Sequence, residues 1–218
     1  MGIGDWFRKT FGKDDGDGKS APESGKWLEP GADGNPFDVR LLDLMANLGV
    51  TATTTDPAIA ARSVSWRLGG QRDIDVHVEG TTHGCDLRYP APRELPEGML
   101  YRPRQMEDKW VIVYRDGRMA AARSWTGETK AVARARHDGD ELVLSEVTFA
   151  DNAGFDVYGD PVAAFDWLIR AHALGARIPF PASADGIAIL AAVPLSGFPM
   201  YGRQLFCAAV DYELGPAR

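Results

Sequence analysis

The stretch DKWVIVYRDGRMAAARSWTG, residues 108 to 127, decides the expected fold. Apolar residues flank the pair Asp116-Gly117 on both sides, and Asp-Gly is a favoured two-residue turn of a β-hairpin. With these two residues as the loop, counting outward sets Trp110 opposite Arg123. The stretch therefore predicts an antiparallel hairpin in which a guanidinium and an indole are cross-strand partners.

Two more turn signals extend this hairpin into a larger sheet. Thr126-Gly127 and Asp138-Gly139 separate runs of strand-forming residues. Residues 109 to 149 therefore predict a meander of about four antiparallel strands.

The register of the second turn assigns side chains to the two faces of this sheet. If Thr126 and Gly127 form a two-residue loop, Arg123 also lies opposite Lys130. A three-residue loop would set Ala122 opposite Lys130 and mix the two faces, so we expect the shorter loop. The face away from Arg123 then carries small side chains against which a helix can pack closely: Ala120, Ala122, Ala131, Ala133 and Ala135.

Three segments have start and stop signals of helices: residues 35 to 48, 56 to 68 and 161 to 174. The third has Asp160 as its cap, Pro161 in its first position and Gly175 just past its end. We expect this helix to pack on the alanine-rich face of the sheet.

The remaining patterns add strands and connections. Residues 73 to 79 alternate between polar and apolar and predict a half-buried strand, whereas the proline-rich residues 89 to 103 predict an irregular connection. Apolar runs at 187 to 193 and 205 to 210 indicate strands or buried extended segments. The expected class is α+β: a mainly antiparallel sheet, a meander of about four strands plus additional strands, with helices packed on one face.

Residues 1 to 13 differ from the rest of the chain. They predict a short amphipathic helix, followed by a flexible linker over residues 14 to 34 and a single α+β domain over 35 to 218. The helix could pack on its own domain, dock on a partner or lie weakly on a membrane surface. Its apolar face consists of Ile3, Trp6, Phe7 and Phe11.

Composition narrows the classes of function. A formal net charge of -7 opposes general attraction to nucleic acid. The two cysteines are far apart and match no paired metal-ligand spacing. No run approaches the roughly 20 apolar residues of a membrane helix, and residues 1 to 13 do not form a signal peptide. We expect a cytoplasmic protein without a metal or another cofactor.

Several stretches come close to known motifs without matching them. GKDDGDGKS, residues 12 to 20, has neither the glycine spacing nor the preceding strand of a phosphate-binding loop. His77, His83, Cys85 and Asp86 follow no standard metal or nucleophile spacing, and we interpret them as a solvated strand and turn. No catalytic residues are therefore expected.

The sheet face around Arg123 has two competing interpretations. In the first, Trp110 and Trp125 stack on a flat group while Arg123 and Lys130 contact an anionic group of a partner or ligand. In the second, Arg123 stacks on Trp110 and pairs with Asp108, so that the cluster is an internal clamp. The sequence favours the clamp and leaves the binding surface open as a hypothesis.

Residues 106 to 127, MEDKWVIVYRDGRMAAARSWTG, resemble a signature of uncharacterised soluble bacterial proteins. In that signature a Lys-Trp strand start, here Lys109 and Trp110, is followed by an Arg-Ser-Trp-Thr-Gly turn, here residues 123 to 127. The resemblance implies a bacterial cytoplasmic protein and brings no activity with it.

The absence of a coherent catalytic set favours a non-enzymatic function. We expect an accessory or immunity-type protein that binds another protein through the face formed by Trp110, Arg123, Trp125, Lys130 and Asp108. The alternative is an enzyme or sensor that binds a small anionic ligand, such as a nucleotide, at the same face. A third hypothesis is a peripheral membrane component that uses residues 3 to 11.

Overall fold

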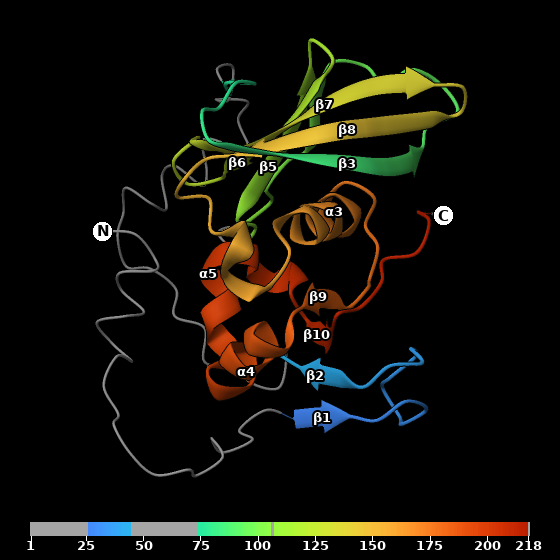
Figure 1. Ribbon diagram of the computed structural model, residues 1–218, viewed down its shortest axis with the longest axis vertical. Coiled ribbons are helices and arrows are strands. Elements are labelled where there is room, and N and C mark those ends of the chain that lie inside the picture. The colour runs from blue at the N-terminus through green and yellow to red at the C-terminus, as the bar shows by residue number, and fades with distance from the viewer. Residues whose placement is uncertain (1–25, 45–73, 106, 218) are drawn as a thin grey trace.

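The computed structural model describes residues 26–44, 74–105 and 107–217. In space, these residues form two sheets with helical elements between them (Figure 1). The α+β class and the mostly antiparallel character of the sheets are confirmed. The helices predicted over residues 1 to 13 and 56 to 68 lie outside the described residues.

The larger sheet has six strands in the order β3-β8-β7-β6-β5-β4, and every neighbouring pair is antiparallel. Its strands are β3 (Thr81–Pro90), β4 (Gly98–Tyr101), β5 (Trp110–Arg115), β6 (Arg118–Arg123), β7 (Thr129–Asp138) and β8 (Glu141–Phe149).

The smaller sheet has four strands in the order β1-β2-β10-β9, in which β10 and β9 are parallel. Its strands are β1 (Lys26–Leu28), β2 (Leu41–Asp43), β9 (Phe180–Ala182) and β10 (Cys207–Val210). Strand β1 pairs with β2, although its residues fall in the predicted linker. The linker prediction was therefore too long, because Trp27 and Leu28 are half-buried residues of this sheet.

Helical elements fill the space between the sheets, and α3 lies directly against the larger one (Figure 1). They are η2 (Phe155–Tyr158), α3 (Pro161–His172), α4 (Ala184–Ala192), η3 (Pro194–Gly197), α5 (Phe198–Tyr201) and η4 (Gly202–Gln204). Helix α3 begins as predicted, because the Asp160 side chain accepts a hydrogen bond from the Val162 N–H. Its aromatic residues Phe165 and Trp167 are fully buried in the main core.

The first hairpin has the predicted register. Trp110 pairs with Arg123, and the turn residues Asp116 and Gly117 have φ values of 53° and 64°. Positive φ at both central residues is the conformation of the tight hairpin turn that Asp-Gly favours. This part of the fold is therefore determined by local sequence.

The second hairpin has a different register from the predicted one. Ala121 pairs with Ala131, and a bulge then sets Ala122 opposite Thr129. Arg123 closes a longer loop instead, since its N–H donates to the Glu128 carbonyl and its own carbonyl accepts from the Gly127 N–H. Strand β7 is therefore shifted by one residue relative to the predicted pairing, so each of its side chains lies on the opposite face of the sheet from the predicted one.

This shift corrects the assignment of the two faces. Trp110, Ile112 and Met119 face the helices together with Ala131 and other residues of the main core. The opposite face is also covered, because Ile74 and Val76 pack on it. The second cluster contains Val111, Val113, Ala120, Ala122 and Val132. The predicted open face of tryptophan and arginine is thus the interior face of the sheet.

Four segments adopt a different secondary structure from the predicted one, and the first is the expected irregular connection at 89 to 103, which contains strand β4. Residues 35 to 48 contain strand β2 instead of a helix in their described part, and residues 187 to 193 lie mostly in helix α4 instead of a strand. Residues 74 to 79 form no strand, although Ile74 and Val76 are buried as the alternation predicted. The run at 205 to 210 does contain a strand, β10.

The fold leaves no room for a side chain at Gly186 of α4, where a Cβ would lie 2.0 Å from the Tyr158 carbonyl oxygen. Alanine is otherwise the better helix residue, but the steric clash outweighs this gain. We therefore expect Gly186→Ala to lower the free energy of unfolding by a net ~2 kcal/mol. Urea denaturation measures this loss. In Gly84→Ala the added methyl meets nothing within 4 Å, and equal losses in both variants would contradict the close contact.

Among the described residues, no single helix is long and apolar enough to cross a membrane. Helix α4 and the segment Pro194–Gln204 reach the required length and composition only together, and they are bent by 111° at the break between them.

Candidate functional site

Arg123 and Trp110 attach helix α5 to the larger sheet. The Trp110 Nε1–H donates to the Met200 carbonyl at 2.7 Å, and an Arg123 Nη1–H donates to the same oxygen at 2.8 Å. Arg123 also donates from Nη2 to the Pro199 carbonyl. A four-residue helix leaves its last carbonyls without partners inside the helix. The cross-strand pair therefore satisfies the carbonyl end of α5, where a positive charge is also favourable.

The predicted stack between these two side chains is present, but it lies on the interior face of the sheet and not on an open one. The Arg123 guanidinium carbon lies 4.8 Å from the centre of the Trp110 ring. Trp110 is fully buried, and burial lowers the pKa of Arg123 to about 10. This arrangement corresponds to the internal clamp, with the α5 carbonyls as its acceptors.

Trp125 contacts a different cation. The Lys109 Nζ lies 4.0 Å from the centre of the Trp125 ring and 5.0 Å from that of Phe198. Lys109 is buried, and burial together with the charge of Arg123 lowers its pKa to about 8. Trp125 is half-buried, so it covers the ammonium group and is not open for stacking on both sides of its ring.

The other two predicted site residues point elsewhere. The carboxylate of Asp108 is fully buried and binds Arg203, whose Nε is 3.1 Å from Oδ1. Asp108 therefore does not pair with Arg123, as the clamp hypothesis had assumed. Lys130 is buried beside Glu128 and Asn152, to whose Oδ1 it donates at 2.8 Å. Of the five predicted site residues, only Trp110 and Arg123 act together.

A pocket of about 450 Å³ lies beside Arg203, the partner of the buried Asp108, and we call it the arginine pocket. None of the described residues that line it carries a carboxylate. They are Tyr101, Arg104, Ala171, His172, Gly175, Arg177, Arg203, Gln204 and Phe206.

Three separate segments bring the arginines to this pocket. Arg104 precedes β5, Arg177 follows α3, and Arg203 belongs to η4. All three are exposed, so their guanidinium groups are accessible from solvent. The Asp108 carboxylate orients two of these segments, because it accepts from the Arg104 N–H at 2.8 Å as well as from the Arg203 side chain. The loop and η4 are therefore fixed relative to each other.

Buried polar groups form the wall behind the arginines. Burial and the neighbouring Asp108 raise the pKa of Tyr101 to about 12, so its hydroxyl stays protonated. The Tyr101 ring meets His172 edge-on, with 4.9 Å between the ring centres. His172 is 5% exposed, and burial lowers its pKa to about 4. The histidine in this wall is therefore neutral near physiological pH.

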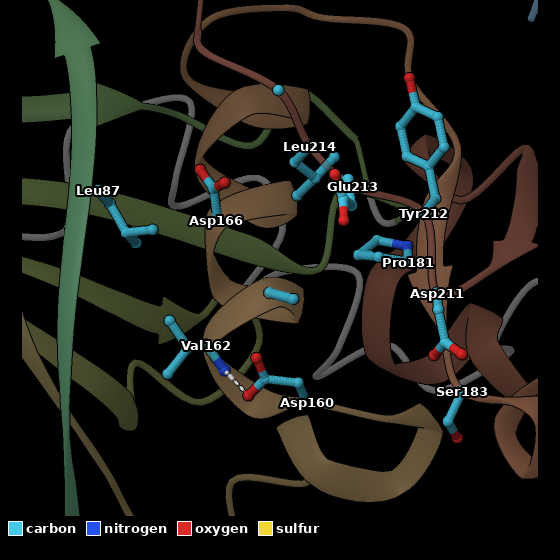
Figure 2. A pocket seen from close by; sticks show the side chains of 12 residues that line it. Leu87, Asp160, Val162, Asp166, Pro181, Ser183, Asp211, Tyr212, Glu213 and Leu214 are labelled. Atoms are coloured by element: carbon cyan, nitrogen blue, oxygen red, sulfur yellow. Dashed lines mark hydrogen bonds between the residues drawn. The ribbon is translucent and has the colours of Figure 1, made fainter.

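A second pocket, of about 490 Å³, has the opposite electrostatic character (Figure 2). Asp160 and Asp166 line it from α3, and Asp211 and Glu213 line it from the C-terminal segment. The α3 carboxylates already have partners: Asp160 caps the helix, and Asp166 binds Arg170 and the Tyr89 hydroxyl. We assign no ligand to this pocket, since Asp166 is buried with these partners and the three exposed carboxylates are ordinary for a protein of net charge -7.

The histidine and cysteine stretch does not form a metal site. His77 is exposed and 3.3 Å from Asp75, His83 packs edge-on against Phe149, and the Cys85 thiol donates to the Leu144 carbonyl. Within the described ranges, no cluster of three or more potential ligands is present. The secondary structure predicted for this stretch was wrong, because His77 lies outside a strand whereas His83, Cys85 and Asp86 belong to β3 and not to a turn.

The arginine pocket has no counterpart among the predicted sites. Its three arginines are far apart in the chain and lie in loops and a short 3₁₀ helix, where no periodic pattern connects them. The signal that could have drawn attention to it is His172, a histidine in the last turn of the helix predicted over residues 161 to 174.

Comparison with family models, with curated proteins and with solved structures finds no match to this chain. The resemblance of residues 106 to 127 to a bacterial signature thus stays a prediction.

Proposed function

We propose that this protein binds a small anionic ligand in the arginine pocket. The observation that carries the proposal is the convergence of Arg104, Arg177 and Arg203 on one cavity whose described lining has no acidic residue. A protein of net charge -7 repels anions at long range. A local group of guanidinium groups is therefore needed before an anion can bind, and this pocket supplies one.

Guanidinium groups suit carboxylates and phosphates in particular. Each has five N–H donors in a planar fork, which matches two oxygens of such an anion. Arg203 uses its Nε toward Asp108 and lines the pocket. Charge-assisted hydrogen bonds of this type are stronger than neutral ones. Binding of a small anion, our alternative hypothesis from the sequence, is thereby supported at a different place.

Binding of another protein through the aromatic and basic cluster has less support. Trp110 is fully buried, Lys109 covers one side of Trp125, and Arg123 is used by α5. We propose that the strands β5 to β8 form one meander that has the helices on one face. The clamp of Trp110 and Arg123 attaches α5 to that same face, so these side chains are used inside the protein. The cluster then has a structural role, and the ligand binds elsewhere.

Titration calorimetry with inorganic phosphate as the probe tests the proposal. We expect saturable binding that weakens roughly tenfold in Arg177→Gln, because one lost charge-assisted hydrogen bond costs ~1.5 kcal/mol. Arg136→Gln is the matched control, since Arg136 is also exposed but pairs with Asp138 on the larger sheet. Equal weakening in both variants would indicate a general charge effect, and absence of binding to the wild-type protein would refute the proposal.

A further inference from the structure

We infer that the anion bound in the arginine pocket carries a hydroxyl group that donates a hydrogen bond to Nε2 of His172, as hydrogen phosphate can. This inference rests on the proposed function and specifies the class of ligand. In this inference His172 determines which anion binds, whereas the arginines supply the affinity for negative charge.

The protonation state of His172 follows from its contact within α3. Its Nδ1 lies 3.0 Å from the Leu168 carbonyl oxygen. A carbonyl can only accept, so Nδ1 carries the proton and Nε2 of the neutral ring is a hydrogen-bond acceptor. Edge-on contacts with Tyr101 and Trp167 fix the plane of the ring. Nε2 of His172 is therefore an acceptor of fixed direction beside the pocket.

This acceptor is unsatisfied. Nε2 of His172 is buried and has no hydrogen-bond partner in the part of the chain that the structure describes. A buried polar atom without a partner costs ~1 to 3 kcal/mol, and such atoms are rare in folded proteins. His172 is also one of the residues that line the arginine pocket. We infer that a ligand in that pocket supplies the donor, and the side chains that close Nε2 off from solvent have to move for this hydrogen bond to form.

Arginines and histidine select different features of the ligand. The guanidinium groups only donate, so they bind sulfate, phosphate and carboxylates alike. An acceptor in the wall favours an anion that retains an O–H. Hydrogen phosphate has one near neutral pH, whereas sulfate has none. A site built to pair with a ligand hydroxyl discriminates strongly against an analogue that lacks it, because its buried polar group then stays unpaired.

Calorimetric titrations of the wild-type protein with inorganic phosphate and with sulfate test this inference without any variant. We expect phosphate to bind at least about tenfold more tightly than sulfate. Methyl phosphate separates a free phosphate from a phosphate ester. It should approach the affinity of phosphate only below about pH 6, where an ester regains its second proton.

His172→Phe retains the ring and removes the acceptor. We expect this variant to bind phosphate and sulfate with about equal affinity, because its affinity for phosphate falls while its affinity for sulfate is unchanged. Equal affinity of the wild-type protein for the two anions would overturn the inference and leave the proposed function intact. Absence of binding for both anions would overturn the proposed function itself. If the variant does not fold, the comparison of anions in the wild-type protein still decides.

Discussion

Replacing Arg123 with alanine is expected to lower the free energy of unfolding by ~3 kcal/mol. The substitution removes both hydrogen bonds of the guanidinium to α5, so the Pro199 carbonyl loses this donor and the Met200 carbonyl keeps that of Trp110. The stack on Trp110 is lost too, and a void is left beside a buried indole. These effects act in the same direction, because Arg123 connects the sheet to a helix with few internal hydrogen bonds.

Chemical denaturation measures this loss, and Arg134→Ala is its matched control. Arg134 lies on the same sheet, but its side chain is 66% exposed and pairs only across the strand with Glu146. Exposed pairs of this kind contribute ~0 to 1 kcal/mol. A similar small loss in Arg123→Ala would mean that the contacts with α5 do not stabilise the fold.

The same variant separates the clamp from the binding site. Arg123 does not line the arginine pocket, so we expect folded Arg123→Ala protein to bind phosphate with about the wild-type affinity. A loss of phosphate binding without a loss of stability would return the ligand to the aromatic cluster, where the sequence had first suggested it.

The two hairpins show which parts of the fold the sequence can determine. The first turn was predicted correctly because Asp116 and Gly117 both accept positive φ, which is a local property. The register of the second hairpin was predicted wrongly by one residue, because β6 carries similar side chains on both of its faces. Ala120, Ala121 and Ala122 have identical side chains, so a slip by one residue exposes no large apolar group and incurs little penalty.

The misassigned helix at residues 35 to 48 has an equally specific cause. Asn35 has the residue type of a helix cap, but its side-chain oxygen accepts from the Phe37 N–H in a turn. Its amide nitrogen donates to the carbonyls of Leu28, Glu29 and Val39. The residue thus closes the loop between β1 and β2, and tertiary hydrogen bonds override its preference for a helix start.

Helix α4 and the arginine pocket were missed for different reasons. The apolar run from residue 187 is short enough to be a strand or a buried helix, and periodicity does not separate the two. The pocket depends on three segments that are distant in the sequence, two of which meet at the buried carboxylate of Asp108. Because the sequence singled out Asp108 without its partner Arg203, the location of the site could be found only after the chain was folded.

Acidification from pH 6.5 to about 4 is expected to destabilise the protein through His172. Burial lowers the pKa of this residue to about 4 in the folded state, against 6.5 for the ordinary side chain. Between these values the unfolded chain binds a proton that the folded protein does not, so stability falls as the pH falls. The full effect is ~3 kcal/mol, and it is absent above pH 6.5, where both states are neutral.

A series of denaturation curves across this pH range measures the effect. His172→Phe cannot take up the proton, so its stability should fall less than that of the wild-type protein by up to ~3 kcal/mol at pH 4. His77→Gln is the matched control, because it removes a histidine whose side chain is 67% exposed instead of buried. If His172→Phe were as acid-sensitive as the wild-type protein, the pKa of His172 would be the same in the folded and unfolded states. The ring would then be open to solvent protons, and its Nε2 would not be the buried acceptor on which selection of hydrogen phosphate depends.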